Sequence, residues 1–193
     1  MDTEKNNTEF YTTLTYVIEF FSNWHCGSGQ AAGADVDALV VKDRDGLPYV
    51  PGRTLKGLLK EAANDLFEDE TAINTVFGIS GDKKNHQTGC AFFSNATFAD
   101  EERKAIVDNK WTNHLFQTFS STAIDENGIA KDNSLRKIET VVPCKLQGII
   151  SNVSKEYVDM LEEAMHFVKR MGTGRNRGYG RCQLTITGKE EVK

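Results

Sequence analysis

The chain has 193 residues, enough for one domain with a sizeable core or for one domain with a large insertion. Hydrophobic residues make up 39% and Pro occurs only 3 times, which indicates a globular chain and not an extended disordered one, and no apolar run approaches a membrane span. The polar start is unlike a signal peptide, so we expect a cytoplasmic protein with no membrane partner; the net charge of -5 argues against a nucleic-acid partner unless the basic residues cluster.

The first half of the chain alternates between strand and helix patterns. Apolar and polar residues alternate from Phe10 to Phe21 and predict a β-strand. A loop rich in small residues, His25 to Ala34, comes next, followed by a short strand from Val36 to Val41 and a turn at Asp43 to Gly46. Leucine and alanine at helical spacing then predict a helix from Arg53 to Phe67.

The remaining elements include two more helices. A short helix from Glu70 to Phe77 and a loop from Gly78 to Gly89 precede an alternating strand, Cys90 to Phe98. Helical spacing returns from Ser154 to Met171, with a serine N-cap and a glycine stop. Arg181 to Thr187 closes the chain as another strand.

A polar stretch lies between the strand that ends at Phe98 and the helix that begins at Ser154. From Ala99 to Gln147 few residues could pack, and Asn127-Gly128 is a hairpin-turn signal, so we predict an insertion over about 99–150. The order strand, helix, strand, insertion, helix, strand predicts an α+β sandwich of the ferredoxin-like (RRM-like) kind as one domain over 1–193. Its antiparallel sheet would carry helices on one face and leave the other face for a ligand.

The segment from Arg170 to Arg181 carries the most chemistry. No Asp or Glu occurs from Ala164 to Lys189, so this part of the chain is basic despite the overall charge. Glycines let backbone N–H groups approach phosphates closely, arginines supply planar donors, and a tyrosine can stack on a base; a solvated glycine-rich turn is the alternative. The predicted RNA contacts here are Gly172, Gly174, Arg175, Asn176, Arg177 and Tyr179.

A second anion site is predicted where the first helix begins. The exposed N–H groups of its first turn lie next to Arg53 and Lys56 and could bind phosphate, although a Pro-Gly helix start is also common in proteins that bind nothing. The four cysteines form no CxxC pair and the spacing of His86 and Cys90 is incidental, so we expect reduced packing thiols and no zinc site.

The two segments together resemble the RAMP superfamily of CRISPR-associated proteins. In that superfamily a strand, an Asp-bearing loop and a helix start of the type PYIPGSSLKG precede a glycine-rich basic loop, as Tyr49–Gly57 and Gly172–Gly180 do here. Asp37–Asp43 is similar to the Asp-Ser-Pro-Val-Ile-Arg-Asp loop of the repeated backbone subunit of type III Csm and Cmr complexes. His25–Gly29 resembles the His-x-Gly-x-Gly loop of the family, and Leu135–Pro143 resembles its protruding thumb hairpin.

The resemblance implies a role and a set of partners. Copies of the chain would stack in a filament along a guide RNA, together with other subunits of a CRISPR complex, while a complementary target RNA pairs with the guide. The thumb, about 118–148, would reach over the neighbouring copy and displace a base pair. Beyond the glycine-rich loop, the RNA contacts implied are His25, Gly27, Ser28, Gly29, Arg53, Thr54, Lys56, Arg136 and Lys137.

Asp37 is the predicted catalytic residue. Its carboxylate would act as general base for a ribose 2′-OH or as a ligand of Mg²⁺ or Mn²⁺, and no organic cofactor is expected. Asp35 is the rival assignment, since both residues point the same way in an extended chain. An isolated loop Asp more often caps a turn, and His25 is open to readings as a base, an RNA contact or a core histidine.

Three other functions stay open. A structural RNA-binding subunit with an idle Asp37 would have almost the same sequence. A guide-processing endonuclease of the same superfamily usually relies on a catalytic His, and a generic module for single-stranded RNA would not need the Asp loop. The carboxylate at the matching site and the thumb-like insertion favour the backbone subunit with endoribonuclease activity.

Overall fold

The main sheet of the computed structural model is antiparallel throughout. The described residues are 11–30, 36–79 and 86–192. The strands lie in the order β4-β7-β1-β8, so the first and third strands of this sheet along the chain, β1 and β7, are neighbours at the centre. Their bounds are β1 (Tyr11–Phe20), β4 (Phe92–Phe93), β7 (Lys145–Ser154) and β8 (Cys182–Val192).

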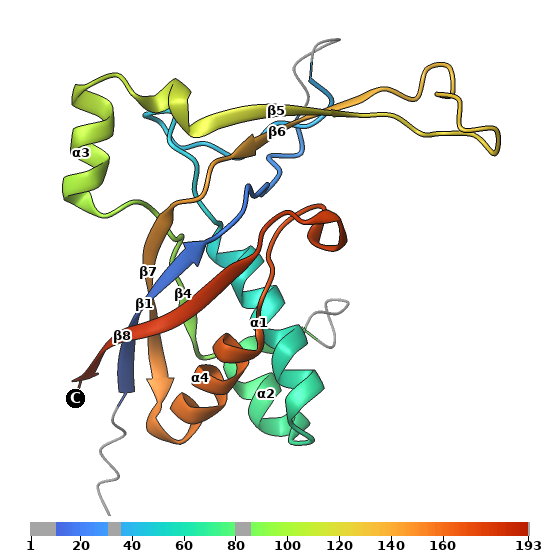
Figure 1. Ribbon diagram of the computed structural model, residues 1–193. Helices are drawn as coiled ribbons and strands as arrows, with labels where there is room; N and C mark the ends of the chain where they lie inside the picture. The colour runs from blue at the N-terminus through green and yellow to red at the C-terminus, as the bar shows by residue number, and fades with distance from the viewer. Residues whose placement is uncertain (1–10, 31–35, 80–85, 193) are drawn as a thin grey trace, which may run out of the picture.

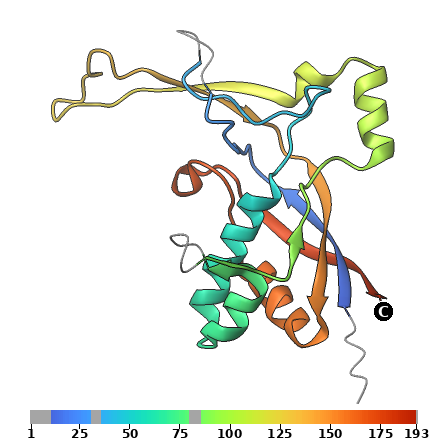
Figure 2. The same cartoon turned by 180° about the vertical axis from the view of Figure 1, so that it is seen from behind.

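Three helices cover one face of this sheet (Figures 1 and 2). They are α1 (Gly52–Leu66), α2 (Glu70–Phe77) and α4 (Val158–Phe167). Alternate residues of β1, such as Leu14 and Ile18, are fully buried beneath them with Leu59 and Leu161. The βαββαβ order with two central strands flanked by antiparallel neighbours confirms the predicted α+β, ferredoxin-like sandwich.

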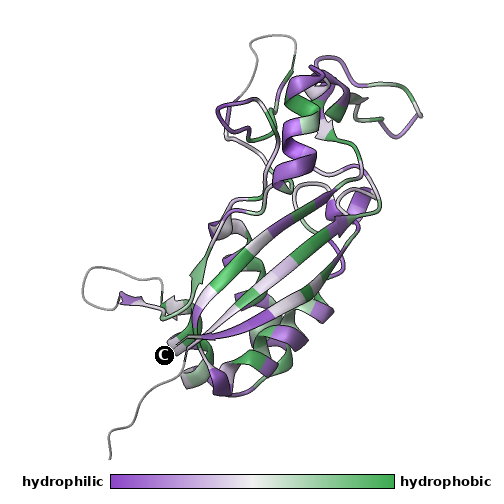
Figure 3. Cartoon of the chain, turned by 90° about the vertical axis from the view of Figure 1, so that its left-hand side faces the viewer, coloured by the Kyte–Doolittle hydropathy of each residue, from purple (hydrophilic) through white to green (hydrophobic). Residues whose placement is uncertain are grey.

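None of the described helices covers the opposite face of the sheet (Figure 3). Threonines and a glutamate of β1, half-buried between the neighbouring strands, alternate with the buried apolar residues. At one edge lies β8, and none of the described strands pairs with its outer side. Among the described residues no helix is long and apolar enough to cross a membrane.

A two-stranded hairpin projects away from this body (Figure 1). Its strands are β5 (Phe116–Ser121) and β6 (Arg136–Val141), and beyond them a turn at Asp125 to Gly128 is closed by a bridge between Ile124 and Ala130. The predicted hairpin turn is therefore confirmed. The short pieces are β2 (Gly78–Ile79), β3 (Gln87–Thr88) and the 3-10 turns Thr112–Leu115, Lys155–Tyr157 and Arg175–Arg177.

The segment before the hairpin forms a helix that the sequence pattern did not predict. This helix, α3 (Asp100–Asp108), buries only Ile106 and so has no apolar stripe. Its Arg103 forms ion pairs with Asp43 and Asp45. Asp43 also accepts hydrogen bonds from the backbone of residues 45 and 47, which confirms the predicted turn.

The bounds of three predicted elements differ in the structure. The insertion ends before Lys145, because 145–154 forms β7 in the main sheet. The alternation of β7 is obscured at Gly148, where a side chain would lie 2.4 Å from the Tyr16 hydroxyl oxygen. The last helix begins at Val158 and ends at Phe167, because Ser154 still has extended backbone and residues 169–171 pair with 180–182 instead. Of the predicted strand from Cys90 to Phe98, only Phe92–Phe93 forms a named strand.

The cysteines fit the prediction of reduced packing residues. All four are free, and Cys26 and Cys182 lie in the core. Burial raises the pKa of the Cys26 thiol to about 12, so it stays protonated and unreactive at neutral pH.

Candidate nucleic-acid interface

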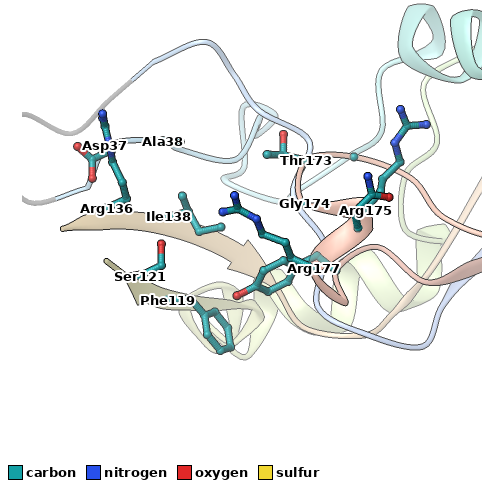
Figure 4. Close-up of a pocket in the computed structure, with 13 residues that line it drawn as sticks. Asp37, Ala38, Phe119, Ser121, Arg136, Ile138, Thr173, Gly174, Arg175 and Arg177 are labelled. Atoms are coloured by element: carbon teal, nitrogen blue, oxygen red, sulfur yellow. The ribbon is translucent and has the colours of Figure 1, made fainter. Parts of the chain in front are cut away.

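A cleft of about 900 Å³ lies between the glycine-rich loop and the hairpin. One wall is the loop from Gly172 to Tyr179, and the other is made by the hairpin strands and the segment that carries Asp37 (Figure 4). None of its lining residues comes from the main sheet. The predicted ligand face on that sheet is therefore not where the cleft lies. The hairpin and loop residues lining it are Phe119, Ser121, Arg136, Ile138, Gly172, Thr173, Gly174, Arg175, Asn176, Arg177 and Tyr179.

The glycine-rich loop depends on its glycines. Gly172, Gly174, Gly178 and Gly180 all have positive φ, from 67° to 91°. A side chain at Gly180 would lie 1.8 Å from the Met171 carbonyl oxygen. The loop can thus fold tightly back on itself and hold the 3-10 turn of residues 175–177 out toward the cleft.

Basic side chains stand on both walls of the cleft. Among the described residues the guanidinium groups of Arg136 and Arg177 have no hydrogen-bond or ion-pair partner. Arg175 lies 3.8 Å from Glu61, a loose exposed pair. A second opening of about 400 Å³ continues along the hairpin and shares Arg136 and Arg177 with the main cleft. The two free arginines therefore face a continuous surface suited to phosphates.

Two aromatic rings also meet across the cleft. Tyr179 of the loop and Phe119 of β5 pack edge to face, with centroids 5.6 Å apart. Phe119 was not among the predicted contacts, and the exposure of an aromatic side chain on a hairpin strand cannot be read from alternation alone. The pair offers a surface on which a base could stack.

Asp37 is exposed at the rim of the same cleft (Figure 4). Its Oδ2 accepts a hydrogen bond of 2.7 Å from the Lys137 backbone N–H, and its own N–H donates to the Lys137 carbonyl at 2.8 Å. Its other carboxylate oxygen accepts no hydrogen bond within the described residues. The structure thus brings the predicted catalytic residue and all six predicted contacts of the glycine-rich loop together, whereas Asp35 lies outside the described residues.

His25 is buried, which corrects its prediction as an RNA contact. Only 3% of the residue is exposed. Its Nδ1 donates to the Glu139 carbonyl at 2.6 Å, and its carbonyl accepts from Thr173 N–H at 2.9 Å. A side chain at Gly172 would lie 2.3 Å from that same carbonyl. His25 therefore orders the glycine-rich loop from behind.

The other predicted contacts lie apart from the main cleft. Gly27, Ser28 and Gly29 belong to a loop that pairs with residues 39 and 40, and half-buried Lys137 meets Asp37 through its backbone. Arg53 and Lys56 line a separate cleft of about 380 Å³. Thr54 lines neither cleft.

The start of α1 has a structural reason of its own. The Gly52 N–H donates to Asn95 Oδ1 at 2.9 Å, so an amide side chain from the segment after β4 caps this helix. A side chain at Gly52 would strike the Phe93 carbonyl at 2.1 Å. The Pro-Gly motif and Asn95 therefore serve packing, and RNA contact at Arg53 and Lys56 stays a prediction.

Among the described residues that line the cleft, Asp37 is the one with a carboxylate that could bind a metal ion. Among the described residues no three His, Cys, Asp or Glu side chains lie close enough to hold an ion together. Mg²⁺ commonly binds through one or two carboxylates together with substrate phosphates and water, and the free oxygen of Asp37 fits that mode.

Comparison with known proteins identifies similar chains. A family model described as the RAMP superfamily matches residues 17–183. A chain from the cryo-EM structure of Type III-B Cmr-beta bound to cognate target RNA has a TM-score of 0.72 and 13% identity, over 90% of this chain and 96% of that one. A chain from its apo-state structure gives 0.70 and 12%, over 91% and 97%. At these identities the likeness is one of fold. No curated protein sequence matches.

Proposed function

The chain belongs to the RAMP superfamily, and on that premise we propose that it is an RNA-binding backbone subunit of a type III CRISPR complex and cuts target RNA with Asp37. The observation that supports this most is the position of Asp37 at the rim of the cleft lined by the glycine-rich basic loop. The solved structures of similar fold come from Type III-B Cmr-beta, one of them bound to cognate target RNA. The partners proposed are therefore guide RNA, complementary target RNA, further copies of this chain and other subunits of a cytoplasmic complex.

RNA binding would rest on the backbone of the nucleic acid. Arg136 and Arg177 would pair with phosphates, and the Tyr179–Phe119 pair would receive a base. Such contacts hold any guide sequence, because phosphate contacts position the strand and base pairing specifies the target. The hairpin, which projects beside the cleft, would bend the paired strands by displacing a base pair.

Cleavage would use the ribose next to the displaced nucleotide. Asp37 takes the proton of the 2′-OH, the 2′ oxygen attacks the adjacent phosphorus, and the bond to the 5′ oxygen breaks. The 5′ oxygen leaves with a proton from solvent, and the other product ends in a 2′,3′-cyclic phosphate. In the alternative role, the free Asp37 oxygen would hold a divalent ion instead of taking the proton; the ion would neutralise charge on the phosphate, and the proton of the 2′-OH would pass to solvent.

The test is cleavage of labelled target RNA by the guide-loaded complex with Mg²⁺. Asp37→Asn is the sharpest variant, because its amide oxygen still accepts the Lys137 N–H while the basic oxygen is lost. We expect cleavage to fall at least 100-fold with target binding within twofold of wild type. A target with a 2′-deoxy sugar at the scissile nucleotide should also resist cutting. Cleavage at the wild-type rate by Asp37→Asn would contradict the proposal.

One observation favours a second candidate, a structural subunit without activity. The hydrogen bond from Lys137 N–H to Asp37 gives the carboxylate a role in pairing two segments, and that role needs no catalysis. A guide-processing enzyme with a catalytic histidine is less well supported, since none of the four histidines lines the main cleft.

A further inference from the structure

The segment that carries Asp37 is held by the hairpin and not by the main sheet. Ala38 forms a parallel bridge with Ile138 of β6, and Val40 forms an antiparallel bridge with Gly27. Asp37 itself is exposed and bonds directly to the Lys137 backbone, so its position depends on that pairing together with how its neighbours are fixed. Any residue that anchors 38–42 on β6 therefore also sets where the Asp37 carboxylate stands.

Glu139 of β6 makes four hydrogen bonds, three of them to this segment and one to His25. Its Oε2 accepts from the Val40 backbone N–H at 3.0 Å, and its Oε1 accepts from Lys42 Nζ at 2.8 Å. Its own N–H donates to the Ala38 carbonyl at 3.0 Å, and its carbonyl accepts from His25 Nδ1 at 2.6 Å. One residue thus ties the Asp37 segment, the His25 loop and the hairpin together.

The environment of Glu139 makes these bonds strong. Its side chain is only 14% exposed, and both carboxylate bonds involve an ionised group. Lys42 is itself held in place, with its ammonium 3.9 Å from the centre of the Phe116 ring on β5. The Glu139 carboxylate is therefore held by Val40 and by Lys42, and Lys42 is in turn held against Phe116 of β5. Neither Val40 nor Lys42 lines the cleft.

We propose that Glu139 is a positioning residue for Asp37: it fixes residues 38–42 on β6 and thereby aims the Asp37 carboxylate at the scissile ribose. The inference rests on the proposed role of Asp37 in cleavage. A displacement of about 1 Å in a reacting group can lower a rate on the order of 100-fold, so a residue that never touches RNA can control the chemical step. Target binding, which uses base pairing with the guide held by Arg136 and Arg177, should depend much less on Glu139.

The experiment compares single-turnover cleavage and target affinity in guide-loaded complexes. We expect Glu139→Ala to lower the cleavage rate at saturating target at least tenfold and to change the target Kd less than twofold. Glu139→Gln should recover most of the rate, since its amide oxygen still accepts the Val40 N–H. Glu162→Ala, which removes a carboxylate paired with Lys189 away from the cleft, should behave as wild type.

A combined variant separates positioning from a general loss of stability. If Glu139 acts only through Asp37, adding Glu139→Ala to Asp37→Asn should cause no further loss of cleavage. Additive losses, or a wild-type rate for Glu139→Ala while Asp37→Asn is inactive, would overturn the inference and leave the proposed function intact. A wild-type rate for Asp37→Asn would instead refute the proposed function.

If Glu139→Ala does not assemble into the complex, a milder variant can test the inference. Glu139→Asp keeps the charge, but its shorter side chain cannot reach both Val40 N–H and Lys42. We then expect a reduced cleavage rate, together with faster hydrogen exchange at the Val40 amide. A wild-type rate with unchanged exchange would overturn the inference.

Discussion

Removal of the two free cleft arginines should change how RNA binding responds to salt. Arg136 and Arg177 stand on opposite walls of the main cleft with no partner within the described residues, so both guanidinium groups are available to phosphates. Each phosphate contact to a single strand contributes about 0.7 to the slope of log affinity against log salt concentration. The double variant Arg136→Ala/Arg177→Ala should therefore have a slope shallower by about 1.4.

That slope translates into a simple comparison. Raising the salt concentration from about 50 to about 200 mM lowers the affinity of both proteins for RNA. The loss should be about sevenfold smaller for the double variant than for wild type. The assay is fluorescence anisotropy with a labelled guide RNA over a series of KCl concentrations. Arg44→Ala is the matched control, because Arg44 is a highly exposed arginine outside the cleft. An unchanged slope in the double variant would refute the assignment of the cleft to phosphate binding.

Further predictions concern the loop, a turn and the hairpin. Gly180→Ala should lower the free energy of unfolding by roughly 3 kcal/mol in denaturant melts, whereas Gly178→Ala, with positive φ but open space around it, should cost about 1 kcal/mol. Asp43 is desolvated, which raises its pKa, but its bonds to Arg103 and the backbone outweigh this and hold the pKa below its usual value. Asp43→Asn should therefore lower the Tm at pH 7, and its difference from wild type should vanish as pH falls through the folded-state pKa. Replacing 123–132, almost all exposed, by Gly-Gly should leave the Tm within about 3 °C and abolish target cleavage.

Each of these predictions has an outcome that would contradict it. Equal unfolding free energies for the two glycine variants would contradict the steric argument at Gly180. A Tm difference for Asp43→Asn that persisted at pH 2 would mean that the side chain packs and does not act through its charge. Cleavage by the shortened hairpin would remove base-pair displacement from the mechanism.

The parts of the fold that could be predicted are those whose burial follows one simple period. In β1 every second residue is buried, and in α1 the buried leucines recur at helical spacing, so pattern and structure agree. In β7 the buried residues are Leu146, Ile150 and Val153, a spacing that no strand period matches, because the pairing with β1 shifts register. For α3, the acidic first turn was the only available signal.

The site divides in the same way. Asp37 and the glycine-rich loop were found from local motifs, and the fold brings them to one cleft. Phe119 and Glu139 could not be predicted from local motifs, because their roles depend on which strand faces which loop. Conversely, the burial of His25 is invisible in its motif, and so is the placement of Arg53, which lines a separate cleft beside β2 and β3.

The outer edge of β8 bears on how copies of this chain can meet. Within the described residues no strand pairs with this edge, and such an edge strand of eleven residues presents backbone donors and acceptors to other strands in solution, a common origin of aggregation. Here the register against β1 slips between Thr15 and Tyr16, and Lys189, Glu190 and Glu191 crowd the far end with charge. A continuous intermolecular sheet is thereby disfavoured, so crowding many copies side by side does not by itself lead them to polymerise through this edge.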